Sequence, residues 1–154
     1  MPDLSIQFLM GMKVASLEKE GPVIEVGKAL EQLSQFLKEK NVKVTGTAMG
    51  LFHDDPKSFN PQKARYEVCL PISGKFKEER GFKVKELGKG AFACITHSGP
   101  IGKIPETYQA ALKWIEENGY QISGPIQEIY QRGIGEAGGS PQECIIEIQF
   151  PVKR

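Results

Sequence analysis

Two glutamates, Glu128 and Glu147, are the side chains of this 154-residue chain that are best suited to chemistry. Side chains alternate along a strand, so Ile126, Glu128 and Tyr130 should share one face. If Ile129 points toward the helices, Glu128 and Tyr130 point the same way as Glu147 on a neighbouring strand. A carboxylate among aromatic rings favours bulky, flat or cationic ligands, since each cation–π contact contributes about 0.5–2 kcal/mol. The alternative is that Glu128 faces water, as one face of many antiparallel strands does.

The chain also repeats itself, which predicts how these side chains are positioned. Residue landmarks recur 78 positions later in the first part of the repeat and 80 positions later in the second. The recurring landmarks are Ala15/Ala93, Gly21-Pro22/Gly99-Pro100, Gly46/Gly124, Pro61-Gln62/Pro141-Gln142, Glu67/Glu147 and Pro71/Pro151. We therefore predict an α+β fold of two β-α-β-β modules, about residues 5–72 and 82–152, related by pseudo-twofold symmetry with antiparallel sheets. A half of this size would bury only about 60% of its unfolded surface, so residues 1–154 should form one domain with a shared core.

The differences between the two copies indicate where a ligand would bind in the cleft between the modules. Gly50 aligns with Glu128 and Ala48 with Ile126, so the first copy is small where the second is acidic. A symmetric frame with one hollow side and one charged side would form an asymmetric cleft, and seams of this kind commonly hold small molecules. The expected ligand-binding residues are Glu128, Glu147, Tyr130, Ile126, Ala48, Gly50 and Phe52.

Hydrophobic periodicity predicts one helix and three strands in each copy. Apolar residues at helical spacing form one stripe at Val26, Leu30, Leu33 and Leu37, and another at Ile104, Tyr108, Ala111 and Ile115. Asn41 and Gly119 stand where these helices should end, and both residue types tolerate positive φ. The predicted strands are 5–18, 42–53 and 64–72 in the first copy and 92–97, 120–132 and 143–152 in the second, with loops at 54–61 and 133–141. In the last strand, Cys144, Ile146, Ile148 and Phe150 should face the helices.

Composition excludes several classes of function. The net charge of +1 gives no electrostatic case for direct binding to nucleic acid. The basic clusters at 38–43 and 75–89 contain acidic residues and are interpreted as solvated faces. No apolar stretch approaches the roughly 20 residues that span a membrane, and the N-terminus lacks the features of a signal peptide. We expect a cytoplasmic protein, either a monomer or a homodimer.

The remaining reactive side chains have structural interpretations. Three cysteines are an odd number at strand positions, which favours reduced thiols, with a catalytic cysteine as the alternative. The segment His53-Asp54-Asp55 is more simply a turn than a metal site, and Glu67 is expected to form a cross-strand pair with Arg65. No cofactor is expected.

The order and spacing of several motifs resemble the GyrI-like, or effector-binding, family of small-molecule-binding domains. The resemblance covers nearly the whole chain and is carried by His53–Pro56, Ala64–Val68, Pro71, His97–Pro100, Tyr108, Trp114, Asn118–Tyr120, Gly124-Pro125, Glu128, Tyr130, Pro141, Glu147-Ile148 and Pro151-Val152. It implies two β-α-β-β modules with a ligand cleft between them. It also implies that Glu128 senses cationic lipophilic compounds and that a second acidic position falls on Glu147. Many relatives have an aromatic residue where this chain has Ile101, so one wall of the pocket is expected to differ.

Three functions are compatible with this resemblance. The first is a stand-alone module that captures bulky aromatic or cationic compounds, for protection against toxins or drugs. The second is a hydrolase that opens the cyclopropane ring of DNA-alkylating natural products, with Glu128 as general base beside Tyr130. The third is a protein-interaction module of the gyrase-inhibitor type.

Overall fold

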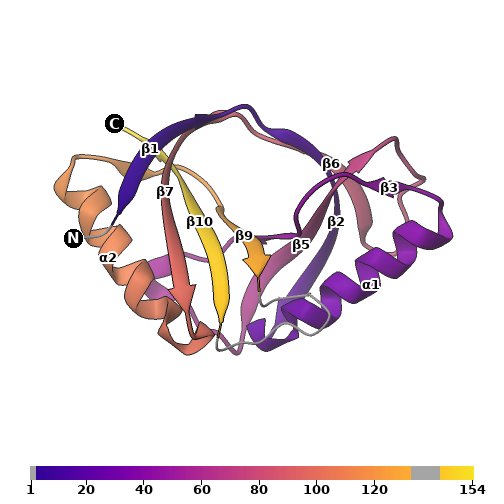
Figure 1. The fold of residues 1–154 in the computed structure, drawn as a ribbon, viewed down its shortest axis with the longest axis horizontal. Coiled ribbons are helices and arrows are strands. Elements are labelled where there is room, and N and C mark those ends of the chain that lie inside the picture. The colour runs from indigo at the N-terminus through magenta and orange to yellow at the C-terminus, as the bar shows by residue number, and fades with distance from the viewer. Residues whose placement is uncertain (1–2, 133–142) are drawn as a thin grey trace.

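The computed structural model describes residues 3–132 and 143–154 of the chain. Among the described residues, the strands, the α-helix and the short helix before it follow in the same order in both halves, and the first half also has η2 (Figure 1). The first half contains β1 (Leu4–Leu9), β2 (Met12–Gly21), η1 (Val23–Glu25), α1 (Val26–Glu39), β3 (Lys43–Val44), β4 (Met49–Phe52), η2 (Pro56–Ser58) and β5 (Ala64–Ser73). The second half contains β6 (Phe82–Leu87), β7 (Gly90–Gly99), η3 (Ile101–Lys103), α2 (Ile104–Glu117), β8 (Gln121–Ile122), β9 (Ile126–Arg132) and β10 (Cys144–Lys153).

The two helices form where the apolar stripes predict them. Each has 14 residues, and neither of these described helices is long and apolar enough to cross a membrane. Asn41 and Gly119 follow the helices with φ values of 57° and 79°, as predicted for helix ends. The helices differ in how firmly they are packed. Six residues of α1 are buried, whereas only Ala111 and Ile115 of α2 are.

The antiparallel sheet runs through both halves in the order β1-β7-β10-β9-β4-β5-β2-β6. The halves exchange their first strands, because β1 pairs with β7 and β6 pairs with β2. The two crossing segments, residues 9–12 and 87–90, lie side by side over the top of the molecule in Figure 1. We call these two segments the arch. Helices α1 and α2 lie at opposite sides below it (Figure 1).

The two halves join at the centre of the sheet, where β4 pairs with β9. Gly50 lies directly opposite Glu128, which is also its equivalent in the repeat. The two strands therefore meet about a local twofold axis at this pair of residues. This pairing agrees with the pseudo-twofold arrangement expected from the sequence.

The sheet has two faces with different packing. We call the face that carries α1 and α2 the helix face, and its main apolar cluster includes Leu33, Val68, Ile148 and Phe150. We call the opposite face the open face, and its smaller cluster consists of Val14, Met49, Leu51, Cys69 and Leu87. The prediction that Cys144, Ile146, Ile148 and Phe150 face the helices is confirmed, since all four belong to the helix-face cluster.

Several predicted strand boundaries are wrong. The strand predicted at 5–18 is divided into β1 and β2 because Gly11 adopts a positive φ of 79°. The segments predicted at 42–53 and 120–132 each form a two-residue strand followed by a longer one. Residues 82–87, interpreted as part of a solvated face, form β6 instead. The predicted loop at 133–141, including Pro141, lies outside the described residues.

Candidate functional site

Glu128 is a buried carboxyl group on the helix face of the central strand β9. Its side chain is 7% exposed. The hydroxyl of Tyr108 of α2 donates a hydrogen bond to Oε2, and the hydroxyl of Tyr130 donates to Oε1 at 3.0 Å. Within the described part of the chain, no lysine, arginine or histidine forms an ion pair with Glu128. The carboxyl group is therefore held by two neutral phenols.

Burial dominates the electrostatics of this group. Loss of water contact raises the pKa of Glu128 above its ordinary value, and the two tyrosine hydrogen bonds lower it only in part. Burial and the neighbouring carboxylate raise the pKa values of Tyr108 and Tyr130 well above that of a free tyrosine. Both phenols therefore remain donors over the ordinary pH range.

Gly50 makes room for this arrangement from the opposite strand. A Cβ atom at residue 50 would overlap Tyr130 Oη and would lie 2.9 Å from Phe52 Cε2. Any larger residue would therefore push Tyr130 away from Glu128. The comparison of the two copies selected Gly50 as the small counterpart of Glu128. The structure shows why a small residue is needed there, because a side chain at residue 50 would overlap Tyr130.

The other first-copy residues predicted for the site also lie on the helix face. Phe52 pairs with Ile126 across β4 and β9, and both belong to the helix-face cluster. Ala48 packs against the same cluster and accepts a hydrogen bond of 2.9 Å from the backbone N–H of Tyr130. The structure thus gathers six of the seven predicted residues around the central strand pair.

Glu147 is the exception, and the prediction that it shares a face with Glu128 is wrong. Glu128 pairs with Ile148, whereas Glu147 pairs with Ile129. Ile129 packs against the open-face cluster, so Glu147 lies on the open face. Its Oε2 accepts a hydrogen bond of 2.6 Å from Gln149 Nε2. The error arose from assigning Ile129 to the helix side.

Glu67, the counterpart of Glu147 in the first half, has partners other than the one predicted. It accepts from Lys85 Nζ at 2.7 Å and lies 2.6 Å from His53 Nε2. Arg65 pairs instead with Asp54, whose carboxylate accepts from both the backbone and the side chain of Arg65. The expected Glu67–Arg65 pair is therefore wrong.

The remaining candidate reactive side chains that the structure describes lie in a turn or are buried. The described residues contain no group of three or more histidine, cysteine and acidic side chains placed to hold a metal ion. Asp55 accepts from the backbone N–H of Lys57, as a turn residue would. Burial raises the pKa values of Cys69 and Cys94 to about 12, whereas a nucleophilic cysteine needs a lowered pKa.

Tyr108 is a residue of the candidate site that was not among the site residues predicted from the sequence. Its spacing predicts a place in the apolar stripe of the second helix, and its ring does pack against Phe150. Its hydroxyl group extends beyond that stripe to Glu128. A phenol within an otherwise apolar stripe was the available signal, because a buried tyrosine hydroxyl usually has a hydrogen-bond partner.

The larger of the two described cavities lies on the open face, away from Glu128. It has a volume of about 500 Å³, and its lining includes the arch residues Leu9–Met12 and the side of β10 that carries Glu147. Glu128, Tyr108 and Tyr130 do not line it. On the helix face, Glu128 is buried and bonded to the hydroxyls of Tyr108 and Tyr130.

Comparison with known proteins agrees with this architecture. The family model of the GyrI-like small molecule binding domain matches residues 2–153. The chain belongs to the GyrI-like family. A search of curated protein sequences found no match to this GyrI-like domain.

Solved structures share its fold at low sequence identity. The C-terminal domain of EcmrR is 22% identical with a TM-score of 0.87, and the match covers 100% of this chain and 99% of that domain. In the EcmrR–DNA complex, which matches at 21% identity and a TM-score of 0.87, the match covers 99% of this chain and 57% of the EcmrR chain. A hydrolase encoded by lin2189 from Listeria innocua is 13% identical with a TM-score of 0.65, covering 97% of this chain and 91% of that one. SAV2435 bound to tetraphenylphosphonium is 15% identical with a TM-score of 0.62, covering 98% and 94%.

Proposed function

We propose that this GyrI-like domain captures bulky aromatic cations at Glu128, on the helix face between the two halves. The observation that carries the proposal is a buried carboxyl group held by the hydroxyls of Tyr108 and Tyr130, with no cationic partner among the described residues.

The charge of Glu128 favours a cationic ligand. A buried carboxylate without a counter-ion is costly, which is why its pKa is raised. Tyrosine hydroxyls donate hydrogen bonds but supply no positive charge. A cation that enters beside Glu128 would stabilise the ionised carboxylate, and the tyrosine rings would add cation–π and stacking contacts of about 0.5–2 kcal/mol each.

Entry of a bulky ligand requires Tyr108 to leave Glu128. Tyr108 belongs to α2, which has two buried residues, whereas α1 has six. Displacing α2 would expose less apolar surface than displacing α1, and therefore costs less. We infer that α2, rather than α1, moves when a ligand binds.

The ligand class has further support from a structural neighbour. SAV2435, which shares the fold, is bound to tetraphenylphosphonium, a large aromatic cation. Protection against toxic or drug-like cations is the role that such capture would serve here.

Calorimetric titration with tetraphenylphosphonium tests the proposal. We expect Glu128→Gln to weaken binding by about tenfold or more, since loss of a buried charge contact costs more than about 1.4 kcal/mol. Glu31→Gln is the matched control, because Glu31 is an exposed residue of α1 and the substitution changes the net charge equally. Equal affinity of wild type and Glu128→Gln would refute the role of Glu128.

A hydrolase is the second candidate, favoured by the raised pKa of Glu128. A carboxyl group with a raised pKa is a better general base at neutral pH than an ordinary glutamate. Glu128 would take a proton from a water whose oxygen bonds to a strained ring carbon. The ring carbon–carbon bond would break, and the released carbon would take up the proton that Glu128 removed from the water, with Tyr130 helping to position that water. Incubation with a cyclopropane-bearing alkylator should then give ring-opened product with wild type but not with Glu128→Gln, whereas stoichiometric binding without product excludes the reaction.

A further inference from the structure

The cavity on the open face contains an acidic group that the helix-face site does not use. The cavity of about 500 Å³ is within the usual size range of small-molecule pockets. Among its described lining residues, Glu147 is the one with a charged side chain. Its floor also contains the amide side chains Gln127, Gln131 and Gln149.

The equivalent position in the first half shows what such a glutamate requires. Glu67 is 2% exposed and lies on the open face opposite Leu51. It contacts the ammonium group of Lys85 at 2.7 Å and the imidazole of His53 at 2.6 Å. These two partners lower the pKa of Glu67 despite the burial that raises it. The first half thus supplies its own cation.

The second half lacks these cationic partners. Under the 78-residue offset, Lys85 corresponds to Gln7 and His53 corresponds to Gln131. Both are neutral amides, and the Gln7 amide donates to Ser5 at 3.1 Å. The hydrogen bond that Glu147 receives in the described structure comes from the neutral Gln149. Glu147 therefore stands at the repeat equivalent of the paired Glu67, with neutral amides at the positions equivalent to its two cationic partners.

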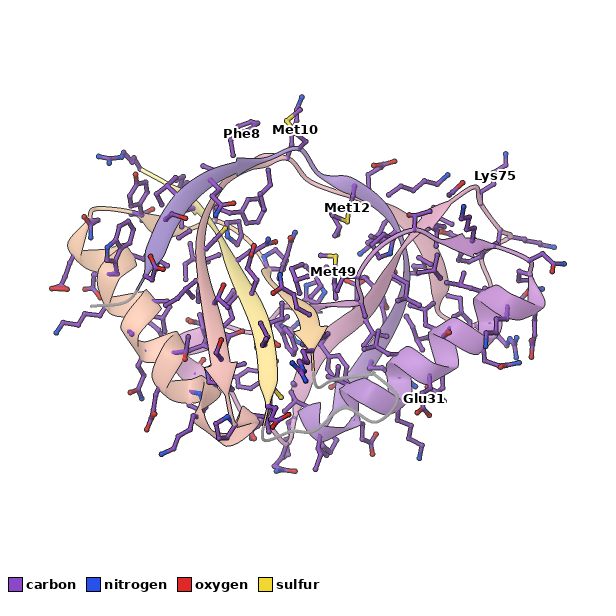
Figure 2. All side chains as sticks on the ribbon, viewed as in Figure 1. Phe8, Met10, Met12, Glu31, Met49 and Lys75 are labelled. Carbon is purple, nitrogen blue, oxygen red and sulfur yellow. The ribbon has the colours of Figure 1, made fainter. Side chains whose placement is uncertain are left out.

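The roof of the cavity is apolar and adaptable. Met12 and Met49 project into the space beneath the arch, whereas Phe8 and Met10 project outward from it (Figure 2). Met12 and Met49 both line the cavity, together with Leu9 and Leu87. Unbranched, polarisable methionine side chains adapt to the shapes of different apolar ligands.

We propose that this cavity is a second ligand site, which binds a primary ammonium compound with an apolar body. The ammonium group takes the place at Glu147 that Lys85 Nζ takes at Glu67, and the apolar part lies under Met12 and Met49. The glutamine amides accept the remaining ammonium hydrogens. The site is separate from the proposed helix-face site, because Glu147 and Glu128 lie on opposite faces of the sheet.

Titration with 4-phenylbutylammonium tests the proposal, with the neutral 4-phenylbutanol as its matched probe. Methionine methyl groups labelled with ¹³C report the location by NMR, since three of the four methionines line the cavity. We expect the ammonium compound to shift the Met12 and Met49 signals and to bind about tenfold or more tightly than the alcohol. Glu147→Gln should weaken ammonium binding by a similar factor, whereas the control Glu31→Gln, at an exposed position of α1, should leave it unchanged.

Gln7→Lys is a more specific test of the site, because it places in the second half the lysine that the first half has at the equivalent position 85. An intramolecular ammonium at Glu147 should abolish binding of the probe while preserving the fold, which circular dichroism checks. Binding that Glu147→Gln and Gln7→Lys both leave intact would overturn the proposal. Equal affinity for the alcohol, or no shift of Met12 and Met49, would also overturn it. Loss of tetraphenylphosphonium binding in Glu128→Gln is a separate result, so failure at one site is distinguishable from failure at the other.

Discussion

Replacing Gly50 with alanine tests whether the central strand pair holds Glu128 through Tyr130. The new Cβ atom would overlap Tyr130 Oη and lie within 2.9 Å of Phe52 Cε2, so the tyrosine ring must move. Overpacking costs about 1–3 kcal/mol, and a lost hydrogen bond to a charged group costs about 1.5–3 kcal/mol. The lower entropy of the unfolded alanine chain offsets about 0.4–1 kcal/mol. Together these terms give an expected net loss of about 1.5–5.5 kcal/mol in the free energy of unfolding.

Urea denaturation measures this loss. For a slope of about 2 kcal/mol per molar, the midpoint should fall by about 1–3 M. Gly102→Ala is the control, since a Cβ atom there would meet no atom within 4 Å and its φ is not positive. Its unfolding free energy should not fall and should rise by about 0.4–1 kcal/mol, because the lower entropy of the unfolded alanine chain acts there without any overlap.

A second substitution makes the test specific to the tyrosine hydroxyl. Tyr130→Phe removes Oη, the atom nearest to the new Cβ. The nearest remaining atom of residue 130 is then the ring carbon Cζ, 3.1 Å from that Cβ. The double variant Gly50→Ala/Tyr130→Phe should therefore be more stable than the sum of the two single losses, by about 1 kcal/mol or more. Strict additivity, or a Gly50→Ala variant as stable as wild type, would refute the reasoning.

Three further predictions concern charge and backbone conformation. The raised pKa of Glu128 gives stability that is present at low pH and is lost as pH rises through the folded-state pKa, because the folded state then holds more protons than the unfolded state. Thermal unfolding of Glu128→Gln should lack this loss, so its melting temperature relative to wild type should rise with pH. Lys85→Gln should lower the free energy of unfolding in urea by about 1–3 kcal/mol. This is less than the loss for a fully buried pair, because Lys85 is one-third exposed and Glu67 keeps His53 as a second partner. Unchanged stability would contradict this prediction. Asn41→Ala should lower the free energy of unfolding by about 1 kcal/mol, because alanine is strained at the φ of 57°, whereas Asn41→Gly should not. Equal melting temperatures of the two variants would contradict this prediction.

Local patterns predicted the parts of the fold that depend on local physics. The helical stripes required only spacing within one segment, and Asn41 and Gly119 required only the preference of their residue types for positive φ. The strand β6 was missed because its lysines and glutamates resemble a solvated face. It forms by pairing with β2, about 70 residues away in the sequence. No local pattern contains that information.

Periodicity could not determine which face of the sheet carries Glu128, because β9 has an isoleucine on each of its two sides. Ile126 packs in the helix-face cluster, while Ile129 packs against the open-face cluster. Alternation fixes which residues share a face but not which face is covered by helices. The comparison between the two copies was more informative, since it selected Gly50 and Glu128, which lie opposite one another.

The exchange of first strands links the two halves during folding as well as in the final structure. Residues 4–9 and 12–17 pair with residues 90–95 and 82–87, so neither half has a complete sheet until the other is present. Contacts at such sequence separations slow folding and make it cooperative. The chain should therefore unfold in one transition, without a stable half-folded intermediate. A ligand on either face would then slow hydrogen exchange of backbone amides across the whole sheet, including those in the half that it does not touch.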